Sequence, residues 1–413
     1  MRHPLLLIST LFTLFAIASL TAAPFPGFPF HEDGTFRVCQ VTDIQDVPPI
    51  NEDMAAFLRK TLAEQRPDLA LLTGDNTETC GDKQTFPLVA REIVDLFREA
   101  GVPFAITFGN HDSEKKGEQW FTRQEQYDIF RQLGGDLFVD HDVPELSGVG
   151  SGAIALKDQD KPAFLLLLMD SGYYARGGYD GCRKDQIRWY EENASHLPCL
   201  WFQHIIPWDI YENGVLVPVE ATEEAHPQFC QAVPAAPEEE GAFFSEPLGH
   251  YVKPLPQGAE WLEEVKAYGI PVTGMQWVPA LGKYMVTPPE CVWAPMTGQF
   301  LKLAHSPAIT GILAEPPCPP RKEVYTDAEH TWQGKTLYQW WKEMGNLRGA
   351  YFGHDHMNTF DATDAQGIRM GYGKAVTLHS YNDGNPGVRF FDLHDDGSFQ
   401  TWTDTLQDLP QER

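Results

Sequence analysis

Two histidines, His354 and His356, flank one aspartate directly after the apolar run 349–352. Histidine is the commonest protein ligand of transition metals and binds them through a neutral imidazole nitrogen. Two imidazoles at the end of a short extended segment can point to one shared position without the support of a helix. Such a pair is weak evidence by itself, because these histidines are often solvated residues of a loop.

Four further groups of polar side chains follow apolar segments in the same way, namely Asp43, Asp75, Asn110 with His111, and His204. In open α/β sheets, ligands collect beyond the carboxyl ends of the strands, which is where all of these side chains fall. Five segments could therefore deliver polar side chains to one edge of one sheet. This repetition predicts a metal site.

The five segments offer carboxylate, carboxamide and imidazole ligands, a mixture that suits zinc, manganese or iron. Asp75 follows Gly74 and is the natural bridge, since one carboxylate can hold two cations. Two ions about 3.5–4 Å apart can bind one hydroxide between them and clamp a phosphoryl group for in-line attack. The leaving oxygen then needs a proton, and His111, beside Asn110, is the candidate general acid.

Each of these residues also has a purely structural interpretation. Asp43 and Asp75 could cap helices or turns, Asn110 could stabilise a turn, and His204 could be a core histidine. Because five coincidences would be needed at once, the pattern favours the metal site.

Other polar residues near the pattern have no assigned place in it. Asp112 and Asp355 either orient a neighbouring histidine or are simply solvated. Five further histidines are expected to be structural: His226, His250, His305, His330 and His379.

The elements that must position these residues alternate between strands and helices. We expect strands at 37–42, 69–72, 104–108, 153–156, 164–169, 200–203, 349–352, 368–378 and 388–393, and helices around 54–62, 85–97, 124–133, 184–193 and 340–341. This alternation predicts parallel strands with helices on both faces, at least in the first half. The segment 207–332 is rich in proline, glycine and aromatic residues and is too long for an ordinary loop, which predicts an inserted cap or subdomain beside the site.

Residues 1–23 are typical of an export signal, with Arg2 and His3 ahead of an apolar run and Ala22-Ala23 at its end. The run is short for a membrane span, so a cleaved leader is favoured over an anchor. This predicts a secreted or periplasmic protein whose mature domain covers residues 24–413.

The composition is strongly acidic, with 31 Lys and Arg against 58 Asp and Glu and a net charge of −27. This balance argues against nucleic acid or an anionic membrane as a partner. The seven cysteines are an odd number, so at least one is unpaired or paired between chains. Cys39, inside an apolar strand, is expected to be a buried free thiol.

The polar segments resemble the five blocks of the calcineurin-like metallophosphoesterases in order and spacing. These segments are Asp43-x-Gln45, Gly74-Asp75, Gly109-Asn110-His111-Asp112, His204 and Gly353-His354-Asp355-His356. The wider chain, including 170–172 and 315–318, resembles the single-domain branch related to purple acid phosphatases. The resemblance covers about residues 36–393 and implies a four-layer α/β/β/α sandwich with a long proline-rich insert.

The resemblance also implies a ligand set for two metal ions, with iron, manganese and zinc as candidates. The first ion would be held by Asp43, Asp75 and His356, and the second by Asp75, Asn110, His204 and His354. His111 would contact the phosphoryl group or the leaving oxygen.

Two residues depart from the family pattern. Gln45, a further candidate ligand of the first metal, stands where many members have a histidine. Glu78 stands where purple acid phosphatases have a ligating tyrosine. A carboxamide oxygen is a weaker ligand than imidazole for zinc or iron, so the first metal is expected to be held more loosely.

The function predicted from these observations is an exported phosphomonoesterase that uses a metal-bridging hydroxide on a small phosphorylated substrate. A phosphodiesterase with the same metals is the nearest alternative. A degenerate, non-catalytic binding protein is the alternative from another class. In that case, Gln45 would indicate a site that no longer holds two metals. The sequence leaves the oligomeric state open.

Overall fold

The computed structural model describes residues 25–79, 81–114, 119–194, 196–219 and 308–408. It also describes nine short pieces between them: 229–230, 232–234, 243–245, 250–254, 275–278, 283–286, 291–294, 296–304 and 306. The expected leader, residues 1–23, lies outside the described residues.

A five-stranded sheet runs in the order β23-β22-β2-β3-β4. Its strands are β2 (Thr35–Val41), β3 (Leu69–Thr73), β4 (Phe104–Thr107), β22 (Gly387–His394) and β23 (Phe399–Thr405). β2, β3 and β4 are parallel to one another. Their register pairs Val41 with Leu72 and Leu72 with Ile106. These three strands therefore end level with one another, at the edge where Asp43, Asp75 and Asn110 follow.

A seven-stranded sheet runs in the order β1-β5-β6-β9-β19-β21-β20. Its strands are β1 (Gly27–Pro29), β5 (Gly152–Asp158), β6 (Lys161–Met169), β9 (Cys199–Gln203), β19 (Leu347–Phe352), β20 (Asp361–Thr363) and β21 (Arg369–Tyr372). β6, β9 and β19 are parallel, with Phe202 opposite both Leu168 and Tyr351. β9 and β19 therefore deliver His204 and the His354 segment to the same edge.

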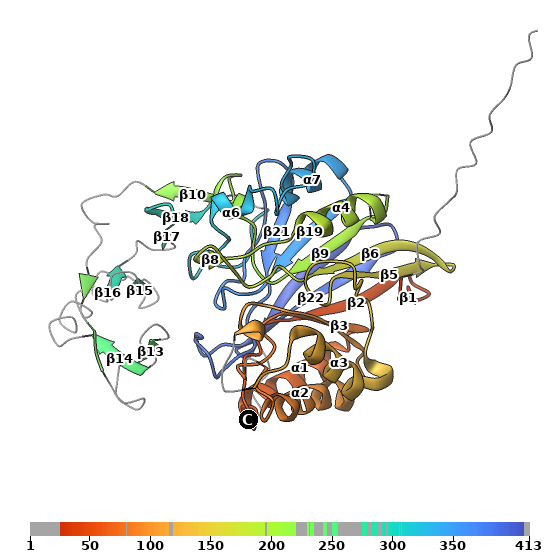
Figure 1. Cartoon of the computed structure of the whole chain (residues 1–413), viewed down its shortest axis with the longest axis horizontal. Helices are drawn as coiled ribbons and strands as arrows, with labels where there is room; N and C mark the ends of the chain where they lie inside the picture. Colours follow the sequence, from red (N-terminus) through yellow and green to blue (C-terminus); the bar gives the residue numbers. More distant parts are fainter. Residues whose placement is uncertain are drawn as a thin grey trace, which may run out of the picture.

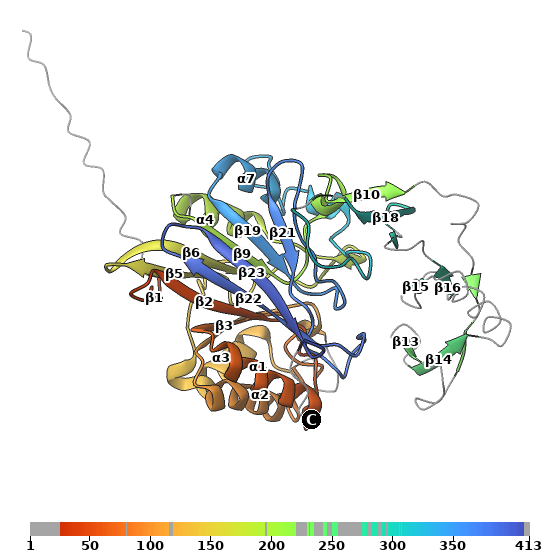
Figure 2. The same cartoon turned by 180° about the vertical axis from the view of Figure 1, so that it is seen from behind.

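Helices cover the outer face of each sheet, and the two inner faces pack together (Figure 1). The five-stranded sheet carries α1 (Glu52–Gln65), α2 (Phe86–Ala100) and α3 (Arg123–Gly134), and the seven-stranded sheet carries α4 (Lys184–Asn193) and α7 (Leu337–Met344). Figure 2 shows the same layers from behind. The four-layer α/β/β/α sandwich is confirmed. The expectation of helices on both faces of one sheet is wrong, because each sheet buries its second face against the other sheet.

Local sequence sets the ends of the helices. The side chain of Asn51 accepts hydrogen bonds from the first backbone amides of α1. At α2 the expected cap, Thr85, makes no capping bond with its own side chain. Asp82 instead accepts from both the amide and the hydroxyl of Thr85. α2 ends at Gly101, in the left-handed conformation that glycine adopts without strain.

The described parts of segment 207–332 include small antiparallel sheets. They contain β10 (Leu216–Val219), β17 (Val292–Ala294) and β18 (Gln299–Leu303); β11 (Phe229–Cys230), β15 (Met275–Val278) and β16 (Lys283–Val286); and β12 (Ala232–Pro234), β13 (Phe243–Ser245) and β14 (His250–Pro254). The short helix α6 (Lys322–Tyr325) follows before α7. The boundaries of the insert stay a prediction.

Three short 3-10 turns and one hairpin complete the described elements: η1 (His111–Ser113), η2 (Gly135–Leu137), η3 (Trp208–Tyr211), and β7 (Tyr174–Ala175) paired with β8 (Gly178–Tyr179). In the described part of the chain, no helix combines the length and the apolar character that crossing a bilayer requires. Cys39 is buried and forms no disulfide, as expected.

The layer between the two sheets contains Phe391, which is fully buried. Its ring centroid lies 4.6 Å from that of Tyr351 and 5.3 Å from that of Phe202 on the opposite sheet. Phe391→Ala should lower the free energy of unfolding by about 3–5 kcal/mol, since it opens a cavity between the sheets. Chemical denaturation measures this, and Leu88→Ala, at a side chain that is 54% exposed, is the control. Equal losses in both variants would contradict the assigned packing.

Candidate metal centre

The candidate ligands come from two sheets rather than from one. Asp43, Asp75 and Asn110 follow β2, β3 and β4 of the five-stranded sheet, whereas His204 and His354 follow β9 and β19 of the seven-stranded sheet. The expectation of one edge of one sheet is therefore wrong. The site lies where the edges of both sheets meet, because the inner faces of the sheets are packed together.

Asp75, His204 and His354 form the tightest group, and one ligand atom from each lies within 4.8 Å of the others. The Nε2 atom of His204 lies 2.9 Å from Oδ2 of Asp75. The two atoms are not aligned as a hydrogen bond, and neither has a hydrogen-bond partner among the described residues. Two buried polar atoms that lie this close without a hydrogen bond fit the arrangement of two candidate ligands of one metal ion.

Asp43 joins this group to His356. Its Oδ1 atom lies 3.5 Å from Nε2 of His356 and 3.8 Å from Nε2 of His204. The backbone amide of His354 lies 3.1 Å from both carboxylate oxygens of Asp43 and donates to them. The three imidazoles and two carboxylates thus form one continuous buried cluster.

Asn110 and Gln45 are buried beside this cluster with unsatisfied side-chain atoms. Neither side-chain polar atom of Asn110 has a hydrogen-bond partner in the described part of the chain. Oε1 of Gln45 also lacks one, while its Nε2 atom lies 3.4 Å from Oε2 of Glu78 and donates to it. Buried polar atoms without partners are costly. Oxygen and nitrogen atoms left in this state fit a site built to hold cations.

The backbone is strained where the candidate ligands lie. Positive φ angles are found at Asp43 (52°), Gln45 (35°), Asp75 (49°) and His354 (76°). They are four of the nine non-glycine residues with positive φ among the described residues. Each such residue costs on the order of 1–3 kcal/mol and persists where the surrounding structure imposes it, often at functional sites. Gln45 shares this feature with three other candidate ligands.

Glycines allow the strands to converge this closely. A Cβ atom at Gly109 would lie 2.2 Å from Oδ1 of Asp75, and one at Gly353 would lie 2.8 Å from Oδ2 of Asp43. Both distances are far below contact distance, so any side chain there would push the carboxylates away. The glycines of the two motifs thus serve the packing of the site.

Charge within the cluster shifts the pKa values of its members. Burial alone raises the pKa of Asp43, but the charges of His204 and His356 outweigh it and hold the pKa below its usual value. Burial also lowers the pKa of His204, but Asp75 and Asp43 outweigh that and raise it to about 9. For His354, burial and the charge of His204 lower the pKa to about 3, so this imidazole is neutral. Metal binding must displace the proton of His204.

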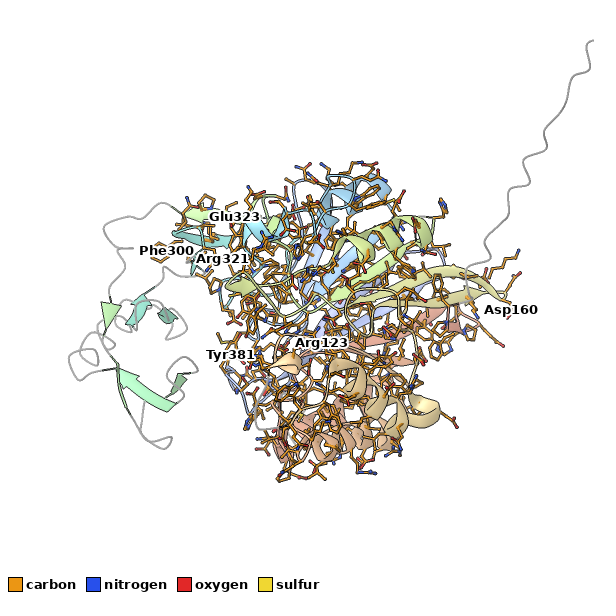
Figure 3. All side chains as sticks on the ribbon, in the orientation of Figure 1. Arg123, Asp160, Phe300, Arg321, Glu323 and Tyr381 are labelled. Atoms are coloured by element: carbon orange, nitrogen blue, oxygen red, sulfur yellow. The ribbon has the colours of Figure 1, made fainter. Side chains whose placement is uncertain are left out.

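Backbone carbonyls orient two of the imidazoles. Nδ1 of His204 lies 3.1 Å from the carbonyl oxygen of Thr73, and Nδ1 of His356 lies 2.7 Å from that of Tyr381. A carbonyl only accepts, so Nδ1 of each ring carries a proton and Nε2 faces the carboxylates. Tyr381, labelled in Figure 3, also stacks on His356 at 3.9 Å, and its hydroxyl donates to the carbonyl oxygen of His354.

Asp112 and Asp355 are buried, so simple solvation is the wrong interpretation for both. Asp112 accepts from the amides of Asn76 and Gly109 at 3.0 and 2.8 Å and thereby ties the loop after β3 to the loop after β4. Burial and the charge of Asp75 raise the pKa of Asp112 to about 7. Asp355 accepts from the hydroxyl of Tyr372 at 2.6 Å.

Arg123 is a residue of the site region that the sequence did not reveal (Figure 3). Its guanidinium donates to the carbonyl oxygen of Gly109, to the carboxylate of Asp170 and to the hydroxyl of Ser113. It therefore fixes the loop that carries Asn110. No sequence signal marks it, since its partners lie on two other segments, 109–113 and 170–172. The amide of His111, on the same loop, donates to Oδ1 of Asp75 at 2.8 Å.

Of the five histidines expected to be structural, the structure describes the side chains of two, His330 and His379. His330 is buried between Asp180 and Asp327, at 2.7 and 2.8 Å, which confirms a structural role. His379 is partly exposed near Asp46. His226 and His305, and the side chain of His250, lie outside the described residues.

Residues 36–216 match the family model for the calcineurin-like phosphoesterases. The chain is 21% identical over 384 residues to probable inactive purple acid phosphatase 14 of Arabidopsis thaliana, an alignment that covers 85% of this chain and 73% of that protein. It is 25% identical over 198 residues to phosphatase DCR2 of Saccharomyces cerevisiae, covering 39% of this chain and 32% of that one. Among solved structures, a dimetal phosphatase from Danio rerio aligns over 89% of this chain and 98% of its own, with 11% identity and a TM-score of 0.36.

Residues 36–216 therefore form a region of the calcineurin-like phosphoesterase family, and the relatives of this chain include proteins named as probable inactive purple acid phosphatases. The resemblance drawn from the five segments is confirmed. This family uses a dinuclear metal centre, and Asp75, His204 and His354 form a cluster that can hold a metal. The full ligand set, including Gln45, stays a prediction.

Asp75 lies between the two groups of candidate ligands, so Asp75→Asn should remove both metal occupancy and hydrolysis. Losing one negative charge between two cations is far more costly than a change at the surface. Metal analysis and turnover measure the effect. Asp160→Asn is a matched control, since Asp160 also has a positive φ of 65° but lies on an exposed turn (Figure 3). Near-normal metal content in well-folded Asp75→Asn would refute the bridging role.

Gln45→His should raise occupancy of the first metal position and its resistance to chelators, since imidazole binds zinc or iron more tightly than a carboxamide does. In the wild-type protein this metal should be the more easily removed of the two. Metal retention after stepwise dialysis against a chelator measures both effects. Gln159→His is the control, because Gln159 has a similar φ of 46° on an exposed turn. Unchanged retention in Gln45→His would mean that Gln45 does not face the metal.

Proposed function

We propose that this chain is an exported phosphoesterase that holds two metal ions and hydrolyses phosphomonoesters of small molecules. The observation that carries the proposal is the set of buried ligand atoms without hydrogen-bond partners among the described residues. They include Oδ2 of Asp75, Nε2 of His204 and the side-chain oxygen of Asn110. A site of this composition suits iron, manganese or zinc.

The residues of the chain have distinct tasks in this proposal. Asp43, Asp75, Asn110, His204, His354 and His356 would hold the metals, with Gln45 at the first position. When bound, the two ions would supply Lewis acidity toward the phosphoryl group and lower the pKa of a water molecule. His111 would give a proton to the leaving oxygen, and its backbone amide keeps the Asp75 carboxylate in place.

The preference for monoesters over diesters is supported by a relative named as a phosphatase, DCR2 of Saccharomyces cerevisiae. Export is supported by the character of residues 1–23. The chain has 58 acidic and only 31 basic residues, and this negative charge fits a small substrate better than nucleic acid.

A non-catalytic metal-binding protein is the second candidate function. It is favoured by relatives whose names include "probable inactive" and by the departures at Gln45 and Glu78. The proposal of catalysis is preferred because the remaining candidate ligands form a buried cluster and His111 lies beside it, with its backbone amide bonded to Asp75.

Metal analysis of the purified full chain, with turnover of para-nitrophenyl phosphate and bis-para-nitrophenyl phosphate, tests the proposal. We expect two ions per chain and faster turnover of the monoester. His111→Ala should lower turnover about 10²–10⁴-fold with metal content unchanged, as for loss of a general acid. Faster diester turnover would identify a phosphodiesterase. Bound metal without turnover of either ester would identify the binding protein.

A further inference from the structure

His111 has a carboxylate partner that no family motif assigns. Its Nδ1 atom lies 3.2 Å from Oε2 of Glu114, three residues later in the same 3-10 turn. The side chains of His111 and Glu114 are 20% and 26% exposed, so the pair lies beside the buried cluster rather than within it. A pair that is mostly shielded from water is screened less than one at an open surface.

Glu114 is held in turn by a second residue. The hydroxyl of Tyr174, from the β7–β8 hairpin, donates to Oε1 of Glu114 at 2.6 Å. Both carboxylate oxygens are therefore engaged, one by His111 and one by Tyr174, and the carboxylate cannot rotate without losing a hydrogen bond. Burial and the hydrogen bond to Glu114 raise the pKa of Tyr174, so its hydroxyl stays a donor.

The hairpin that carries Tyr174 is itself packed against the metal cluster. The ring of Tyr174 stacks on that of Tyr179 at 5.6 Å, and the ring of Tyr179 lies edge-on to His354 at 4.2 Å. Through Tyr179, the ring of His354, a candidate metal ligand, therefore helps to hold Tyr174 in position. Three segments far apart in the sequence are linked in this way: the loop after β4, the hairpin, and the segment after β19.

We propose that Glu114 and Tyr174 are positioning residues that fix the ring of His111 for proton donation. A carboxylate only accepts hydrogen bonds, so Nδ1 of His111 is the donor in this pair and Nε2 is the nitrogen that serves the leaving oxygen. Without Glu114 the ring can rotate, and either nitrogen can carry the proton. This role rests on the proposed phosphoesterase function, in which His111 is the general acid.

A purely local role for Glu114 is the alternative. Its backbone amide also closes the 3-10 turn by donating to the carbonyl oxygen of His111. That bond uses no side-chain atom, so it survives replacement of the side chain. A structural role therefore predicts no change in the ring of His111 when the side chain is shortened.

Steady-state kinetics of the metal-loaded full chain test the role in catalysis. Glu114→Ala should lower kcat about 10–100-fold, the usual range for a residue that orients an active group, with little change in KM or metal content. Glu114→Gln should recover most of kcat, because an amide oxygen still accepts from Nδ1. Tyr174→Phe should give a smaller loss. Tyr173→Phe is the matched control, as Tyr173 is exposed to a similar extent and its hydroxyl has no hydrogen-bond partner among the described residues.

Histidine ¹⁵N NMR of the zinc-loaded protein gives a readout that does not need turnover. The ring of His111, assigned by comparison with His111→Ala, should carry a proton on Nδ1 in the wild type and in Glu114→Gln. It should lose this preference in Glu114→Ala. The same ring state in all variants, or equal losses of kcat in Glu114→Ala and Glu114→Gln, would overturn the proposal. If the wild type hydrolyses no ester, the spectrum still decides whether Glu114 positions the ring, and only the proposed function fails.

Discussion

The structure depends on the burial of two carboxylates and three imidazoles at the place where the edges of two sheets meet. Asp43 and Asp75 are almost fully inaccessible to water, and so is His204 between them. Burying charges of this kind is costly unless they are paired or hold a metal. The positive φ angles at Asp43 and Asp75 add local strain. The close packing of the two sheets, which brings their edges together, maintains this arrangement.

Residues that are not themselves candidate metal ligands hold the loops of the candidate metal centre in place. Arg123 connects the loop after β4 to Asp170, and Asp112 connects that loop to the one after β3. Tyr381 contacts both histidines of the last segment through its ring, its hydroxyl and its carbonyl group. Such contacts fix the direction of the ligands before any substrate arrives, which lowers the cost of reorganisation during a reaction.

The departures from the family pattern are confined to one side of the cluster. Gln45 and Glu78 contact each other through the carboxamide nitrogen, and the carboxamide oxygen is left without a partner among the described residues. Asp75, Asn110 and the histidines keep the pattern of the family. On the proposed function, such a change alters how tightly one metal is held and leaves His111, the proposed general acid, in place. Relatives named as inactive therefore do not by themselves decide whether this chain turns over an ester.

The sequence by itself determined most strands of the two large sheets, most of the helices and the residues that follow the strands at the site, because apolar runs followed by Gly, Asp, Asn or His are local patterns. It missed β1, β20 and β23, and the strand expected at 368–378 is shorter, Arg369–Tyr372. It also predicted that the polar residues at these ends gather at one site. Only the tertiary structure decided that two sheets share the site, since nothing local says which strands pair. The same holds for Arg123 and Tyr174, whose partners are distant in the chain. Glu114 lies three residues from His111, yet only the folded turn shows that their side chains meet.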